Sequence, residues 1–253
     1  MRKIYVIARC EYRMQWRRPA VWGILIAAAA LALWDSFPSA GNLARLEFLN
    51  QPTYFVQRIM GLDGLIVVFG LTFLLAGRLD TDRRAGVRAL MLAAPLRRWE
   101  YALGKLLGGF CLTFSALGLF LTVLTAVYWV AAPEGTGALA CALPLGKALA
   151  CCVLPVSLFA GFVSVTLPAW MDVRLFYLLA AAFFGVNAAY VGSAEGAPWW
   201  LLTSGDLLRL IWTHPRWPGV SSAGVAANAA FLVGCALAAA SLLLATRKWW
   251  RRP

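Results

Sequence analysis

Charged and titratable side chains are scarce in this sequence. Only 13% of the 253 residues are charged, 62% are hydrophobic, and His214 is the single histidine. The apolar share is well above that of an average soluble domain, and the charged share is well below it. Because the lone histidine lies in a Trp-rich loop, no Ser-His pair can form on a membrane span, which excludes much hydrolytic chemistry.

Motifs for binding nucleotides or metals are also lacking. The sequence contains no G-x-x-x-x-G-K-[ST] run, since the Gly-Lys pairs at 104–105 and 146–147 lack the upstream glycine and the hydroxyl residue that cradle a phosphate. The six cysteines have no metal-ligand spacing, and no apolar run carries a cluster of aspartates. We therefore expect no catalytic residue, metal or cofactor on this chain, and any ATP and magnesium to be bound by a partner subunit.

Long apolar runs are what the sequence has in abundance. A helix needs about 20 apolar residues to cross a bilayer, and six runs reach roughly that length. They predict an all-α membrane protein whose residues 1–253 form a single transmembrane domain, with spans over about residues 20–37, 61–79, 101–131, 140–167, 173–192 and 223–246. Pro144 and Pro155 are expected to kink the fourth span, because proline removes a backbone hydrogen bond.

The basic residues predict the orientation of these spans. The formal charge is +12, and the 23 Lys and Arg gather beside the apolar runs rather than in a stripe that would fit nucleic acid. If both termini are cytoplasmic, 18 of the 23 lie on the inner side, as the positive-inside pattern requires. The sequence thus predicts a multi-pass membrane protein with both termini inside and no nucleic-acid partner.

Three further segments are not expected to span the membrane. Residues 1–18 alternate basic and apolar side chains at helical intervals, which predicts an amphipathic helix lying in the headgroup plane. Residues 38–60 are mixed in polarity and are predicted to form an outer loop. Residues 201–212, in a stretch rich in tryptophan and proline, are too short to span and predict an interfacial or re-entrant helix between spans five and six.

The most charged internal segment carries a resemblance to a known family. Residues 80–107 read DTDRRAGVRALMLAAPLRRWEYALGKLL, and this pattern resembles the cytoplasmic segment of the permease subunits of ABC-2 type transporters. The matching residues are Asp82, Gly86, Leu90, Ala94, Pro95, Arg98, Gly104 and Lys105. The chain departs from the family pattern at Asp82, Val87 and Ala94, where Glu, Thr and Ser are common.

The resemblance implies a subunit of an exporter that lacks its own ATPase site. Two copies of this permease, or two different permeases, would bind two ATPase subunits in a bacterial or archaeal cytoplasmic membrane. Residues 83–92 would form a coupling helix, cytoplasmic between spans two and three. The implied ATPase-coupling residues are Asp82, Arg83, Arg84, Gly86, Arg88, Leu90, Met91, Leu92, Pro95 and Arg98. Alternatively, these arginines merely enforce the topology of the chain.

Three polar residues in or near the spans are candidates for a substrate path. Lys147 and Asp63 are ionisable groups near outer span ends, where such groups either mark a pathway or snorkel to the headgroups, and snorkelling is favoured for both. Asn187, in the fifth span, either faces the path or forms a hydrogen bond with a neighbouring helix.

Two other functions compete with export. An intramembrane enzyme is disfavoured, because the spans show neither a metal-binding cluster nor a nucleophile-base pair. A membrane component of an ABC-type assembly, which transmits force or aids maturation of an extracytoplasmic protein without passing a substrate, fits the sequence as well as an exporter does. An apolar path suits lipids, peptides or hydrophobic drugs, and polysaccharide precursors are equally compatible with the resemblance.

Overall fold

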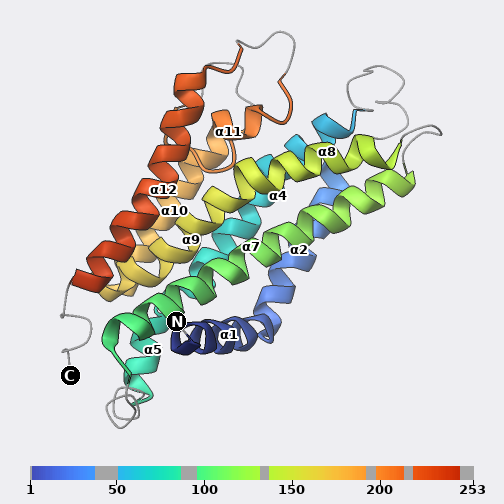
Figure 1. The fold of residues 1–253 in the computed structure, drawn as a ribbon. Coiled ribbons are helices and arrows are strands. Elements are labelled where there is room, and N and C mark those ends of the chain that lie inside the picture. Colours follow the sequence, from blue (N-terminus) through green and yellow to red (C-terminus); the bar gives the residue numbers. More distant parts are fainter. Residues whose placement is uncertain are drawn as a thin grey trace.

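The computed structural model describes residues 2–37, 51–86, 96–131, 137–191, 198–213 and 219–245, and within these ranges every regular element is a helix (Figure 1). The helices are α1 (Arg2–Trp16), α2 (Pro19–Asp35), α4 (Pro52–Leu75), α5 (Arg78–Arg84), α7 (Arg98–Ala131), α8 (Ala138–Ala148), a π-helix (Leu149–Val153), α9 (Leu154–Thr166), a 3-10 helix (Leu167–Ala169), α10 (Val173–Ala189), α11 (Asp206–Arg209) and α12 (Ser222–Ala245).

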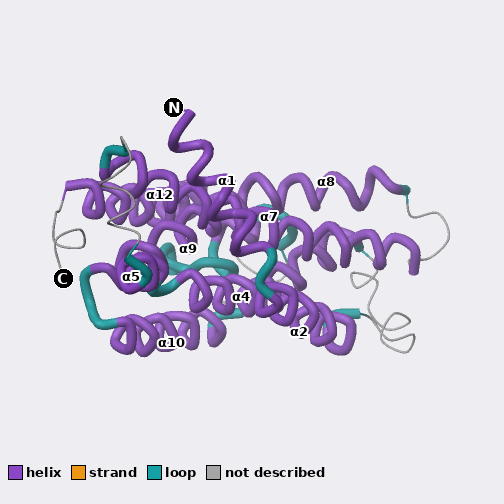
Figure 2. Tube along the Cα trace, turned by 90° about the horizontal axis from the view of Figure 1, so that it is seen from below, coloured by secondary structure: helices purple, strands orange, loops and turns teal. Residues whose placement is uncertain are grey.

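The long helices form a bundle with distinct ends. Helices α4, α7, α9 and α12 run side by side, and α1 lies across one end of the bundle close to α5 (Figures 1 and 2). The last turn of α12 reaches the same end, whereas α11 lies toward the opposite one (Figure 1). The segment that follows α4 therefore begins beside the N-terminal helix.

The described part of the chain contains four helical stretches that are long and apolar enough to cross a membrane. They are α4, α7, α12 and the continuous helix Ala138–Ala169. Helices α1 and α2 qualify only together, as a pair bent by 60°, and α10 is a shorter apolar helix of 17 residues. The structure thus supports an all-helical, membrane-like chain with four or five candidate spans, and the count of six stays a prediction.

The predicted outer loop over residues 38–60 is wrong for residues 52–60, and residues 38–50 lie outside the described part of the chain. Helix α4 begins at Pro52, a residue suited to a helical first turn, and the segment up to residue 60 is helical. Phe55, Val56, Ile59 and Met60 are all buried. Gln51, Pro52 and Arg58 made the segment look like a loop, but the apolar residues recur at helical spacing and form one buried face.

A glycine turn separates α4 from α5. Gly77 has φ +73°, in the left-handed region that favours glycine. The hydroxyl of Thr81 donates to the Gly77 carbonyl over 3.1 Å, in the first turn of α5. Helix α5 overlaps the coupling helix predicted over residues 83–92 only at Arg83 and Arg84; residues 85 and 86 form a turn, and residues 87–92 lie outside the described part of the chain.

Replacing Gly77 with alanine should destabilise the fold by about 1–2 kcal/mol, because an L-residue pays that cost in the left-handed region. The measurement is unfolding of the purified protein in mixed micelles as SDS is titrated. Gly23→Ala is the matched control: a Cβ at Gly23 in α2 meets nothing within 4 Å, so alanine should be neutral or stabilising there. Equal effects of the two substitutions would contradict the argument.

The fourth predicted span is interrupted by a π-helix, whereas Pro144, which was expected to kink it, lies inside the regular helix α8. The chain is helical from Ala138 to Ala169, but five residues directly before α9 form a π-helix. Pro155 occupies the first turn of α9, where its missing N–H leaves no donor for the preceding turn. Cys152, in the π-helix, donates through its Sγ to the carbonyl of Leu207, so the irregular turn contacts the segment that carries α11.

That segment, residues 198–213, packs against the bundle and is buried over most of its length. Leu201 and Leu202 are buried, and α11 contacts both α4 and α12. The predicted helix over 201–212 is wrong in extent, since only Asp206–Arg209 is α-helical. The reason is that two side chains take over the backbone hydrogen bonds: Asn187 accepts from the Leu202 N–H over 2.7 Å, and Asn228 binds three more backbone groups.

Candidate functional site

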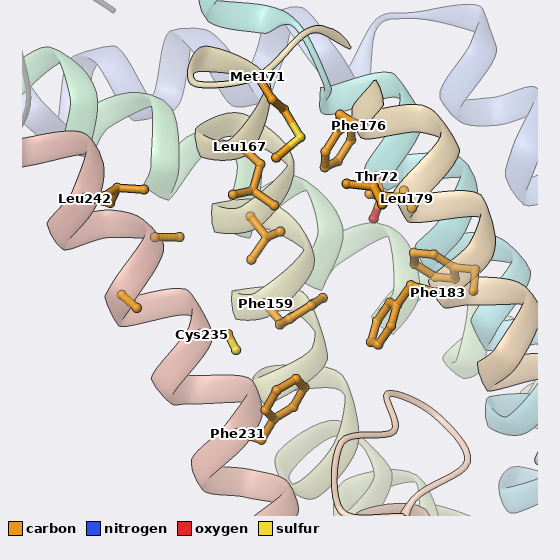
Figure 3. Close-up of a pocket in the computed structure, with 15 residues that line it drawn as sticks. Thr72, Phe159, Leu167, Met171, Phe176, Leu179, Phe183, Phe231, Cys235 and Leu242 are labelled. Atoms are coloured by element: carbon orange, nitrogen blue, oxygen red, sulfur yellow. The ribbon is translucent and has the colours of Figure 1, made fainter. Parts of the chain in front are cut away.

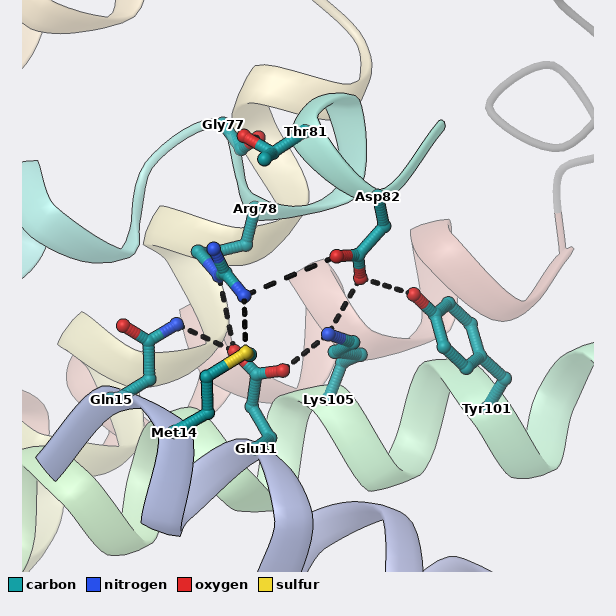
Figure 4. Close-up of polar contacts among 9 residues, drawn as sticks. All are labelled: Glu11, Met14, Gln15, Gly77, Arg78, Thr81, Asp82, Tyr101 and Lys105. Atoms are coloured by element: carbon teal, nitrogen blue, oxygen red, sulfur yellow. Dashed lines mark hydrogen bonds and ion pairs between the residues drawn. The ribbon is translucent and has the colours of Figure 1, made fainter. Parts of the chain in front are cut away.

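Four charged side chains from three helices, three of them buried and one partly buried, form a closed ring, which we call the charge ring. It consists of Glu11 of α1, Arg78 and Asp82 of α5, and Lys105 of α7 (Figure 4). Arg78 Nε lies 3.1 Å from Glu11 Oε1, and Lys105 Nζ lies 2.6 Å from Asp82 Oδ2. Lys105 also pairs with the second oxygen of Glu11, and Arg78 Nη2 lies 4.0 Å from Asp82 Oδ1.

Two neutral side chains complete the hydrogen bonding of the ring. Tyr101 donates its hydroxyl to Asp82, and Gln15 donates to Glu11 Oε1 over 2.6 Å (Figure 4). Glu11 is 3% exposed, and Asp82, the most exposed member, has a side chain that is 16% exposed. Two acids face two bases, so the ring is neutral as a unit although each member is shielded from solvent.

Small residues explain how α1 approaches α7 closely enough to place Glu11. A Cβ added at Gly104 would lie 2.6 Å from Cβ of Ile7, and one added at Gly108 would lie 2.7 Å from Cβ of Glu11. Glycines four residues apart on one helix form a shallow groove into which a second helix packs. The backbone at Gly108 therefore sets the depth at which the Glu11 carboxylate enters the bundle.

The start of α7 places the two remaining side chains. The N–H of Arg97 donates to Oε2 of Glu100 over 2.8 Å, which is one half of a capping box, and α7 begins at Arg98. Tyr101 and Lys105 follow at a spacing of four residues, which puts them on one face of the helix. Both can then reach Asp82 of α5.

The energetics of the charge ring favour its staying intact. Taking each ion out of water costs several kcal/mol, and this cost is offset only when every charge keeps its partners. Removing one member leaves an uncompensated buried charge, whereas moving the three helices together leaves all pairs in place. The charge ring thus holds α1, α5 and α7 together and favours their moving as one unit.

The structure describes only some of the predicted coupling residues. Asp82 belongs to the charge ring, Gly86 has φ +68°, and Arg98 lies half-buried in the first turn of α7. Arg83 and Arg84 form the end of α5. The remaining predicted coupling residues lie outside the described part of the chain, and they are Arg88, Leu90, Met91, Leu92 and Pro95.

The three candidates for a substrate path lie apart in different surroundings. Asn187 is fully buried, donates to the Phe183 carbonyl of its own helix and accepts from the N–H of Leu202 in a non-helical segment, so its partners are not on a neighbouring helix. Lys147 is exposed on α8. Asp63 is 1% exposed and accepts a hydrogen bond from Ser36 over 2.9 Å, so the expectation that it snorkels is wrong. Its burial follows from the packing of α2 on α4, which the sequence pattern does not show.

Sequence reasoning missed Glu11, Arg78 and Tyr101 as members of this site. A usable signal was present for Glu11, because it is the only acid among the basic residues of the first 18. An acid that weakens a basic membrane-surface helix needs a partner elsewhere. Asp82 and Lys105 belong to the motif of the family resemblance, but nothing in that motif showed that they pair.

Neither protein-family models nor curated proteins nor solved structures match this chain. Among the described residues, no group of three or more His, Cys, Asp or Glu is placed to hold a metal ion. The function is therefore inferred from the sequence pattern and from the geometry around the charge ring.

Proposed function

We propose that this chain is the membrane-spanning permease subunit of an ABC-2 type exporter. Two permease subunits would associate in a bacterial or archaeal cytoplasmic membrane and bind two ATPase subunits, which hold the ATP and the magnesium. The observation that supports this best is the charge ring, because it joins the segment expected to contact the ATPase to two other helices of the bundle.

The charge ring has the properties that a coupling element requires. Residues 83–92 begin in the last turn of α5, so a displacement of that segment displaces Arg78 and Asp82 with it. Through the ring the displacement reaches Glu11 and Lys105, and so acts on α1 and α7 together.

Helix α7 can pass this motion across the bundle. It is continuous over 34 residues, which at about 1.5 Å per residue gives a rod of roughly 51 Å. Such a rod exceeds the hydrocarbon thickness of about 30 Å. A tilt imposed at the α5 end would therefore reach the opposite side of the membrane, where a substrate leaves.

The decisive experiment replaces residues 83–92 with a neutral Gly/Ser linker of equal length. The tagged chain is purified from membranes of its native host, and the amount of P-loop ATPase that accompanies it is measured by quantitative mass spectrometry. We expect at least about a tenfold loss, which corresponds to ~1.4 kcal/mol of binding free energy. Linker replacement of residues 132–136, predicted to lie on the opposite side, is the control and should leave the complex intact. Undiminished recovery of the ATPase with the variant at residues 83–92 would contradict the proposal.

A further inference from the structure

Helix α1 presents a stripe of arginines on the side turned away from the bundle. Arg2, Arg9 and Arg13 are spaced seven and four residues apart, which places them on one face of the helix, and all three are exposed. Glu11 lies about half a turn around α1 and points into the charge ring (Figure 4). The only acid of the first 18 residues is thus neutralised on the inner face, and the outer face carries positive charge alone.

The three arginines form no ion pair within the described part of the chain. The pairs found there join Arg58 to Asp35 and the members of the charge ring to one another. A basic face that no acid of the chain covers is complementary to an anionic partner outside the chain.

Apolar side chains lie among these arginines on the outer face. Tyr5 is 64% exposed and Val6 is 51% exposed, and both lie within one turn of Arg2 and Arg9. The boundary between headgroups and acyl chains offers phosphate oxygens and hydrocarbon within the width of one helix. An acidic protein surface or a nucleic acid would match the arginines but not the exposed apolar side chains.

Aromatic residues at the junction of α1 and α2 indicate the depth of α1. The two helices are bent by 60° relative to each other. The indole N–H of Trp22 donates to the Trp16 carbonyl over 3.1 Å, and the two rings meet edge to face with centroids 5.3 Å apart. Tryptophan prefers the membrane interface. If α2 enters the bilayer as predicted, α1 lies at headgroup level on the side that the basic residues mark as cytoplasmic.

We propose that the outer face of α1 binds the phosphate headgroups of anionic phospholipids in the cytoplasmic leaflet. That leaflet attracts basic segments, and each arginine near its surface raises the affinity about fivefold. The proposal needs a bilayer around the bundle but no ATPase, so it can fail or hold independently of the exporter function.

The apolar groove between α9, α10 and α12 provides a comparison within the same molecule. Figure 3 shows Phe159 of α9, Phe183 of α10 and Phe231 of α12 on its walls, and its volume is about 490 Å³. All of its lining residues except Thr72 of α4 are apolar. Such a lining contacts the acyl chains of any phospholipid alike and does not select a headgroup charge.

Photocrosslinking of the purified full chain in nanodiscs tests the proposal. Phosphatidylglycerol and phosphatidylcholine are compared, each with a diazirine in one acyl chain, and labelled peptides are quantified by mass spectrometry. We expect phosphatidylglycerol to label residues 2–16 at least about fivefold more than phosphatidylcholine does, while both label the groove-lining peptides of α9 and α12 equally. The excess should shrink in about 1 M salt, where the screening length falls to ~3 Å. Equal labelling of α1 by the two lipids, or no labelling of α1 by either, overturns the proposal.

Matched double variants locate the binding. Arg9→Gln with Arg13→Gln should bring the excess on α1 close to one, while Arg97→Gln with Arg174→Gln, which removes the same charge at other exposed positions, should leave it. Arg9→Lys with Arg13→Lys should retain the excess, because the charge is what the headgroup binds. These side chains lie outside the charge ring, so far-UV circular dichroism should be unchanged in every variant. An undiminished excess in the folded glutamine variant, or its loss in the lysine variant, contradicts headgroup binding by this face.

Discussion

Replacing Lys105 with methionine should destabilise the protein by about 3–5 kcal/mol, the cost of breaking a buried ion pair from one side. The methionine is similar in length and leaves the packing of α1 on α7 largely intact, so the effect is electrostatic. Glu11 and Asp82 would then share Arg78 alone, which leaves one excess negative charge among side chains shielded from water.

The measurement is the free energy of unfolding in mixed micelles, followed by far-UV circular dichroism. Asp35→Asn is the matched control, because Asp35 pairs with Arg58 over 3.4 Å at an exposed site, where such pairs contribute 0 to about 1 kcal/mol. The double variant Glu11→Gln with Lys105→Met should recover part of the loss, since it removes one charge of each sign. An effect of Lys105→Met no larger than that of Asp35→Asn would contradict the charge ring.

Replacing Asn228 with leucine should have the second largest effect, at least about 2 kcal/mol, because a buried group left without its partner costs ~1–3 kcal/mol. The Asn228 side chain is fully buried and binds the N–H of Leu207 and the carbonyls of Trp199 and Leu201 at 2.7–3.3 Å. Leucine fills a similar volume but offers no hydrogen bond. The segment 198–213 should then detach from α12 while the long helices persist.

Hydrogen exchange followed by mass spectrometry separates this local loss from global unfolding. Faster exchange is expected in peptides covering residues 198–213, with α7 and α9 still protected. Thr203→Val is the control, since Thr203 makes a single side-chain hydrogen bond to the Gly61 carbonyl over 2.9 Å and should cost about 0.5–1.5 kcal/mol. If protection of the segment were the same in Asn228→Leu as in the unmodified chain, the assigned role of Asn228 would be wrong.

The positions of the long helices follow closely from the sequence pattern. The third predicted span, 101–131, and the sixth, 223–246, compare with Arg98–Ala131 and Ser222–Ala245. Length and hydropathy suffice here because a helix satisfies its own backbone, and an apolar run of this size has no other stable form in a membrane. The pattern failed where a helix has a polar face, as at the start of α4, and where side chains replace backbone partners, as around Asn187.

The sequence pattern could not predict which side chains contact one another at the α5 end of the bundle. Glu11 and Lys105 are 94 residues apart in the chain, and Arg78 is 67 residues from Glu11. Their pairing requires the turn at Gly77 and the close approach of α1 to α7 at Gly108, and neither is a local property of the charged residues. The hydropathy of a segment depends on its own residues alone. The local sequence therefore correctly predicts apolar helices beside basic flanks without knowledge of what packs against them. A buried charge is stable only beside its counter-charge, and that juxtaposition arises only when distant helices pack.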